Sequence, residues 1–233
     1  MTLLEIAAAL DWSPLWISIK TGIVATIISF FLGIYVARKA IGMKPRARAI
    51  IDGLFTLPMI LPPTVSGFFL LLIFSKRRPV GRLLFNIFDI QVVHTWLGCI
   101  MAATVIALPL MYRNARAAFE QVDPDLVLAG RTLGMSEFMI FWRVVIPTAG
   151  PGVAAGTILT FTRAMGEYGA TSMLAGNIPG RTSTISQKIA MVIQNGDYAT
   201  AGIWVVAVLL IGFLAVYAIN MITSRHIRNA KRW

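Results

Sequence analysis

The sequence comprises 233 residues, of which 57% are hydrophobic and only 13% are charged. A soluble domain of this length needs a far more polar surface, so the composition excludes a soluble protein and predicts an all-α, polytopic membrane protein. The net charge of +11 would suggest nucleic-acid binding in a soluble protein. In a membrane protein, Lys and Arg beside the spans account for it, and we expect no nucleic-acid partner.

Five segments are apolar enough to cross a hydrocarbon core, which takes about 20 helical residues. They are 16–37, 50–74, 92–112, 148–174 and 202–223. The fourth is over-long and rich in small residues, so we expect it to begin or end outside the bilayer. The opening 1–15 is too short for a further span, and it lacks the basic start of a cleaved signal peptide. Without a soluble domain boundary or a repeat, residues 1–233 are predicted to form one transmembrane domain.

The distribution of basic residues predicts the orientation of the chain. If the N-terminus is outside, the inner side holds thirteen Lys and Arg, in 38–48, 113–143 and 225–232. The outer side holds six, of which four lie in the turn 75–82. The positive-inside rule therefore places the N-terminus outside, the C-terminus inside and the loop 114–147 in the cytoplasm. The basic turn 75–82 either tolerates exposure or weakly attracts an anion or an acidic receptor.

The second span contains several prolines, which interrupt helical hydrogen bonding. Pro58, Pro62 and Pro63 cannot all lie in an unbroken helix, and irregular backbone at membrane depth is tolerated beside protein or a water-filled cavity. We therefore predict a translocation path lined by Pro62, Pro63, Thr64 and Ser66, with two hydroxyl groups that would hold an anion weakly enough to release it. The alternative is a proline-kinked helix that only packs.

The loop 114–147 contains the signals for two short helices. Asp123 can cap a helix that begins at Pro124, and Gly134 can end it in a left-handed turn. Ser136 can cap a second helix, which we expect to end near Pro147. Two short helices at a sharp angle between spans indicate a docking element for a soluble partner. The alternative is an amphipathic loop lying on the membrane surface.

Two charges lie deep in the fourth predicted span. Arg163 and Glu167 are four residues apart, so they share one helix face and can pair. The pair either fixes this helix against its neighbours or forms a gate that opens and closes. The pattern Gly152–Gly156 indicates a close helix contact, within the bundle or across a dimer axis. The segment 174–199 is predicted to be a re-entrant or surface element, or else a solvated loop.

The chain lacks the usual signatures of an enzyme. It has no G-x-x-x-x-G-K-[ST] phosphate loop, and His94 and His226 have no spacing suited to a metal site. An intramembrane enzyme would need converging polar residues at one depth. We therefore expect no catalytic residue, no metal and no bound cofactor, and a subunit that takes its energy from a partner.

The docking loop resembles the EAA loop of ABC importer permeases. That loop reads Glu-Ala-Ala, three residues, Gly, nine residues and Ile-x-Leu-Pro. Here Ala129-Gly130 is followed after three residues by Gly134 and after nine more by the Val-Val-Ile-Pro run that ends at Pro147. The chain departs from the pattern where Leu128 replaces the acid and Gly130 replaces alanine.

Within these permeases the chain is most similar to the molybdate branch. The similarity is carried by the core Arg131-Thr-Leu-Gly134, by LPMILPPTVSGFFLLLIF (57–74) and by TRAMGEYGATSMLAGNIPG (162–180). The resemblance implies the type I ABC importer permease fold in a bacterial or archaeal cytoplasmic membrane. The ATPase-coupling residues it implies are Leu128, Ala129, Gly130, Arg131, Gly134 and Pro147.

The resemblance also implies the partners and the substrate. Two copies would surround one path, with two ABC ATPase subunits, which bind ATP and Mg²⁺, on one side and an extracytoplasmic oxyanion-binding protein on the other. The expected substrate is molybdate, which no sequence feature separates from tungstate. The alternatives are a sulfate or thiosulfate permease and a non-transporting membrane assembly subunit.

Overall fold

The computed structural model describes residues 10–230, which fold into helices and connecting turns without a strand. Residues 1–9 and 231–233, and the side chains of 219, 220 and 222–230, lie outside that description. The predictions for the opening segment and for the basic residues of 225–232 rest largely on these residues and are not tested. Within the described range, every predicted span contains helix.

Within residues 10–230, four helical runs are long and apolar enough to cross a membrane, and a broken pair would make a fifth. The four runs are α2 (Ser13–Ile41), α6 (Trp96–Glu120), the run Glu137–Met165 and α12 (Tyr198–Ala230), of which Tyr198–Ala218 forms the apolar part. The broken pair is α3 (Pro45–Ile60) and α4 (Pro63–Phe74). The run Glu137–Met165 is made of α8 (Glu137–Ile140), a π-helical turn (Phe141–Val145) and α9 (Ile146–Met165). The remaining helices are α5 (Pro79–Phe88), α7 (Pro124–Thr132), α10 (Gly169–Ala175) and α11 (Ile185–Gln194).

The helices α2, α6 and α9 pack closely because small residues line their contacts. Ala25, Ala103, Ala107 and Ala164 form one fully buried cluster among the three helices. A Cβ added at Gly156 would lie 2.5 Å from Asn114 Cβ on α6. The Gly152–Gly156 pattern is therefore a contact within the bundle, where small residues let two backbones approach.

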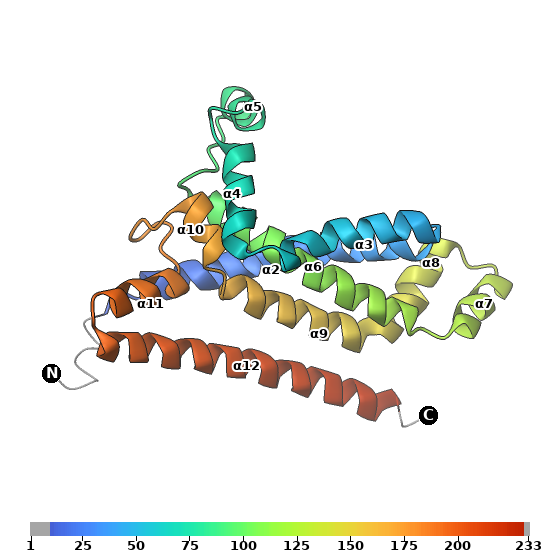
Figure 1. Cartoon of the computed structure of the whole chain (residues 1–233). Coiled ribbons are helices and arrows are strands. Elements are labelled where there is room, and N and C mark those ends of the chain that lie inside the picture. Colours follow the sequence, from blue (N-terminus) through green and yellow to red (C-terminus); the bar gives the residue numbers. More distant parts are fainter. Residues whose placement is uncertain (1–9, 231–233) are drawn as a thin grey trace.

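The helix α4 lies across the direction of the other spans. It is bent by 109° from α3, and in Figure 1 it projects from the bundle with α5 at its far end. It crosses α10 closely: a Cβ at Gly67 would lie 2.6 Å from Ala170 Cα, and one at Gly169 would lie 3.0 Å from Pro63 Cβ. The crossing at Gly67 therefore requires glycine, whereas a side chain at position 169 would need Pro63 or Thr64 to shift slightly.

One end of the bundle carries α10 and α11, and the other carries α7 and α8 (Figure 1). The segment 174–199 is not a solvated loop, because Thr182, Ile185 and Gln187 are buried in it. The Gln187 amide donates to the Gly176 carbonyl over 2.9 Å, and the Ile185 N–H donates to Ser18 Oγ on α2 over 2.8 Å. These contacts fix α11 against the bundle.

The predicted bounds of the fourth span were wrong at both ends. The prediction placed the span at 148–174. The helical run observed there begins at Glu137 and ends at Met165. The segment 166–168 breaks the helix, and Gly169–Ala175 forms the separate helix α10. The predicted loop 114–147 is also shorter, because α6 continues to Glu120.

Candidate functional site

The first helix of the docking element begins as the sequence predicted. Asp123 is the N-cap of α7, its carboxylate accepts the Asp125 N–H over 2.9 Å, and Pro124 occupies the first helical position. The proline costs nothing there because its missing N–H would have had no helical partner. Capping is local chemistry, which explains why the pattern alone located this end.

Gly134 ends α7 with a left-handed turn, as predicted. Its φ is +73°, its N–H donates to the Arg131 carbonyl over 2.9 Å, and the Met135 N–H donates to the Gly130 carbonyl over 3.1 Å. These two hydrogen bonds form a Schellman motif, which needs a residue at positive φ. The turn directs the chain from α7 into α8.

Two contacts hold α7 and α8 together at this corner. Gly130 is buried, and a Cβ there would lie 3.1 Å from Ile140 Cγ1, so an alanine would fit only if the Ile140 side chain shifted slightly. Arg131 Nε donates to Glu137 Oε1 over 2.7 Å. The hydrogen bond to this carboxylate raises the pKa of the Arg131 guanidinium above its ordinary value, so the arginine stays charged.

The second short helix does not end near Pro147, and that prediction was wrong. Ser136 caps α8 by accepting the Met139 N–H, as expected, but the helix continues through Phe141–Val145 into α9. Those five residues form a π-helical turn, a wider turn in which a helix can take up an irregularity. The proline lies two residues beyond this turn, and Thr148 Oγ1 donates to the Val144 carbonyl over 2.7 Å. The docking element is therefore rigidly continuous with a span.

The docking element is anchored by buried aromatic rings and exposes other apolar side chains. Phe141 is buried against Phe119 of α6 with ring centroids 5.5 Å apart, and the Arg38 guanidinium lies 4.2 Å from the Phe141 ring centroid. In contrast, Leu133 is 79% exposed and Phe138 is 65% exposed. A pocket of about 590 Å³ lies between this element and the ends of α2 and α6.

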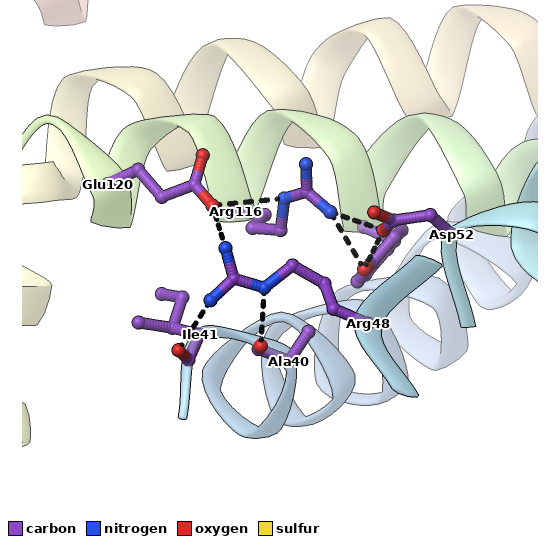
Figure 2. Close-up of polar contacts among 7 residues, drawn as sticks. Ala40, Ile41, Arg48, Asp52, Arg116 and Glu120 are labelled. Atoms are coloured by element: carbon purple, nitrogen blue, oxygen red, sulfur yellow. Dashed lines mark hydrogen bonds and ion pairs between the residues drawn. The ribbon is translucent and has the colours of Figure 1, made fainter. Parts of the chain in front are cut away.

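A polar cluster next to the docking element joins α2, α3 and α6 (Figure 2). Arg116 on α6 contacts Asp52 on α3, and its Nε lies 3.3 Å from Glu120 Oε1. Tyr112 donates to the same Asp52 carboxylate over 2.5 Å. Arg48 donates to the carbonyl groups of Ala40 and Ile41 at the end of α2, over 3.1 and 2.7 Å.

This cluster is the main polar attachment of α3. None of the residues of α3 is fully buried, and its apolar contact with the bundle comes from Ile51 and Phe55, which are partly buried against the cluster that contains Tyr112. Glu120 belongs to the cluster, being 3.8 Å from Arg48, and it also lines the pocket under α7 and α8. Glu120 therefore lies between α3 and the pocket beside the docking element.

The sequence did not point to this cluster. Asp52 and Arg116 are 64 residues apart, and no spacing rule pairs them. A signal was present, because Asp52 is an acid inside the predicted second span, and acids are rare within spans.

The break in the second span lies where the prolines predicted it. Pro62 is the extended N-cap of α4, and Pro63 is its first residue. Thr64 is exposed beside the break, whereas Ser66 is buried with α10 beside it, and its hydroxyl has no hydrogen-bond partner among the described residues. The two hydroxyls therefore differ in access, and Ser66 does not line an open path in this structure.

The predicted ion pair forms, although its geometry differs from the prediction. Arg163 Nη1 lies 2.7 Å from Glu167 Oε2, but α9 ends at Met165, so Glu167 is beyond the helix rather than on its face. The second oxygen of Glu167 accepts the Ala170 N–H over 2.8 Å. Glu167 thereby connects α9 to α10.

The predicted site residues fall into two groups in space. Leu128, Gly130, Gly134 and the other docking residues lie at the α7–α8 end, and all of them except Gly130 are exposed. The second group is at the break in the span, where Arg163 and Pro63 line the same small pocket.

The chain matches, over residues 29–229, the family described as binding-protein-dependent transport system inner membrane component. It is 36% identical over 216 residues to the putative molybdenum transport system permease protein YvgM of Bacillus subtilis, covering 93% of this chain and 95% of that protein. It is 35% identical to the molybdenum transport system permease protein ModB of Escherichia coli, covering 86% and 88%. It is 31% identical to the sulfate transport system permease protein CysT of Escherichia coli, covering 94% and 83%.

Solved structures show the same fold at low sequence identity. A chain of the inward-facing MetNI methionine ABC transporter superposes with a TM-score of 0.74 at 18% identity, covering 97% of this chain and 99% of that one. A chain of a bacterial ABC transporter that imports alginate superposes with a TM-score of 0.72 at 15% identity, covering 95% and 82%. The all-helical fold predicted from the sequence, that of type I ABC importer permeases, is confirmed.

Proposed function

The chain belongs to the family of binding-protein-dependent transport system inner membrane components, and we propose that it carries molybdate across the cytoplasmic membrane. At the coarser level, it is the membrane-spanning subunit of an ABC importer. Members of this family are not enzymes themselves and work with an ATPase and a binding protein. Molybdate, the copy numbers and the orientation belong to the proposal.

The observation that carries the substrate proposal is the order of the similarities. The molybdenum permeases are 35–36% identical, and the chain covers 95% and 88% of their lengths. The sulfate permease is 31% identical, and 83% of its length is covered. Tungstate resembles molybdate in size and charge, so it is expected to share the path.

The proposed coupling surface is the exposed side of α7 and α8. Leu128, Leu133 and Phe138 present apolar area that no other described part of the chain covers, as expected for a surface that enters a groove on an ATPase. Closure of two ATPase subunits would displace α7, and the polar cluster would pass that movement to α3. The α7–α8 end is then cytoplasmic, and the α10–α11 end faces the binding protein.

The proposed second copy covers α3 and α4. Ile50 and Ile60 are each 72% exposed, and Leu54 is 62% exposed. The exposed apolar face of α3 ends at the broken backbone, which is where a path between two copies would run. Pairing through this face would also complete the translocation pathway, which in this proposal lies between the two copies.

The test is uptake of labelled molybdate in the native cells, with and without the gene for this chain. We expect uptake to disappear without the gene, unlabelled tungstate to compete, and sulfate to compete only in large excess. Loss of sulfate uptake with molybdate uptake intact would refute the molybdate proposal and favour the sulfate permease, the alternative that the CysT similarity supports.

A further test separates a permease from a membrane assembly subunit that transports nothing. Solubilised from native membranes under mild conditions, an importer permease should bring with it a chain that carries a Walker phosphate-binding motif. Purification of the chain without such a partner, from membranes that support ATP-dependent uptake, would contradict the proposed coupling.

A further inference from the structure

A small pocket lies at the break between α3 and α4. It has a volume of about 130 Å³ and is lined by Pro58, Met59, Leu61, Pro63, Ile106, Leu110 and Arg163. Pockets for drug-sized ligands usually measure about 300–1,000 Å³, so this one suits a small ion rather than an organic solute. Among the described residues, Arg163 is the only charged one that lines it.

The Arg163 guanidinium is oriented by the protein and still accessible from the pocket. Its side chain is 38% exposed, whereas that of its partner Glu167 is 2% exposed. A second contact holds the Glu167 carboxylate in place, because its other oxygen accepts the Ala170 N–H. Glu167 accepts one N–H of Arg163 Nη1 and is the arginine's only hydrogen-bond partner in the described part of the chain. Most of the five N–H donors of the guanidinium are therefore free to face the pocket.

The asymmetry of this pair is informative. A charge within a span is costly, and it normally faces the bundle interior or a water-filled cavity. Here the Glu167 carboxylate is buried, whereas the Arg163 guanidinium is partly exposed. The same pocket is lined by Pro63, the first residue of α4, and the N-terminus of a helix carries partial positive charge. Both features favour an anion at this point.

We propose that Arg163 contacts the anion in transit, forming a transient site for a tetrahedral oxyanion between its guanidinium and the start of α4. This inference rests on the proposed function, because it takes the cargo to be an oxyanion. A guanidinium matches the planar spacing of two oxyanion oxygens. The buried Glu167 carboxylate offsets part of the positive charge, which keeps binding weak enough for release.

The test uses the assembled importer, with its ATPase and binding protein, in sealed vesicles. Arg163→Gln should reduce molybdate transported per ATP hydrolysed at least tenfold, while the ATPase activity stimulated by the loaded binding protein is retained. Arg163→Lys keeps the charge but loses the paired N–H donors, so its transport should lie between that of Arg163→Gln and that of the wild type. Glu167→Gln serves as the matched control for loss of the ion pair, because it preserves an acceptor for the Ala170 N–H and keeps the Arg163 charge.

A charge-restoration experiment removes the ambiguity of a damaged fold. In a Cys99→Ser background, Arg163→Cys is treated with a cationic methanethiosulfonate reagent or with a neutral one of similar size. Recovery of transport with the cationic reagent alone supports the proposal. Equal recovery with both reagents, or wild-type transport by Arg163→Gln, overturns it.

The remaining outcomes are also decisive. If the Arg163 and Glu167 variants all fail to assemble, the pair is a structural bridge and the proposal is wrong. If wild-type vesicles transport no oxyanion, the proposed function is wrong, and the proposed oxyanion site at Arg163 is wrong as well. If wild-type vesicles transport molybdate and Arg163→Gln does so equally well, only the Arg163 inference fails.

Discussion

Substitution of Gly134 should uncouple ATP hydrolysis from uptake without preventing membrane insertion. The glycine has φ +73°, and a Cβ built on it would meet nothing within 4 Å. The penalty is therefore purely one of backbone conformation, about 1–2 kcal/mol for alanine. That energy lowers the ratio of the correct α7–α8 corner to its alternatives by a factor of about 5 to 30. A β-branched valine at this φ is less favourable still, so Gly134→Val should lose most coupling.

Gly196 provides a matched control at the opposite end of the bundle. It has φ +77°, and a Cβ there would also meet nothing within 4 Å. It ends α11 with the same pair of hydrogen bonds, from the Gly196 N–H to the Ile193 carbonyl and from the Asp197 N–H to the Val192 carbonyl. Gly196→Val therefore carries the same backbone strain away from the proposed ATPase surface.

The assay compares uptake per ATP hydrolysed by the two valine variants, after confirming equal amounts in the membrane. We expect a strong loss for Gly134→Val and near-normal coupling for Gly196→Val. Normal coupling by a properly inserted Gly134→Val protein would refute the reasoning about the corner. An equal loss in both variants would show that general destabilisation, rather than the docking geometry, is responsible.

Three further experiments test the packing and the polar contacts. Gly156→Ala places a Cβ 2.5 Å from an α6 side chain and should cost about 1–3 kcal/mol of stability. The control is Gly150→Ala, whose Cβ meets nothing within 4 Å. Equal melting temperatures for the two solubilised variants would contradict this packing. Arg116→Met and Asp52→Asn should show an interaction energy of about 0.5–3 kcal/mol in a double-mutant cycle, and additive effects would show that the contact between them contributes nothing. Glu137→Gln removes an exposed ion pair, and such pairs contribute little to stability, so it should reduce coupling far less than Gly134→Val does, and less again at high salt. A loss as large as that of the glycine variant would mean that the corner depends on this charge.

Features set by local chemistry could be predicted from the sequence. Asp123 and Ser136 cap their helices because their side chains reach N–H groups two or three residues away. Gly134 ends α7 because the left-handed turn favours glycine. The break near Pro62 follows from missing N–H groups. Each of these depends on residues only a few positions apart.

Features set by an irregular backbone or by long-range contacts could not be predicted in this way. Pro147 was expected to end a helix, but a π-helical turn before it lets the helix continue. Glu167 was expected to lie on the fourth span, but it lies beyond the end of α9 and binds the start of α10. Asp52 acquires its partners only when α3 lies beside α6, which no pattern in the sequence specifies.

The measurement that tests the central claim most directly is ATP-dependent accumulation of labelled molybdate in vesicles that contain the purified importer. The binding protein is supplied on one side and ATP on the other, with Gly134→Val as the uncoupled comparison. The account predicts accumulation by the wild-type protein that requires ATP and is competed by tungstate far better than by sulfate, with little accumulation by the variant. ATP-dependent accumulation of sulfate but not molybdate, or equal accumulation by the variant, would contradict it.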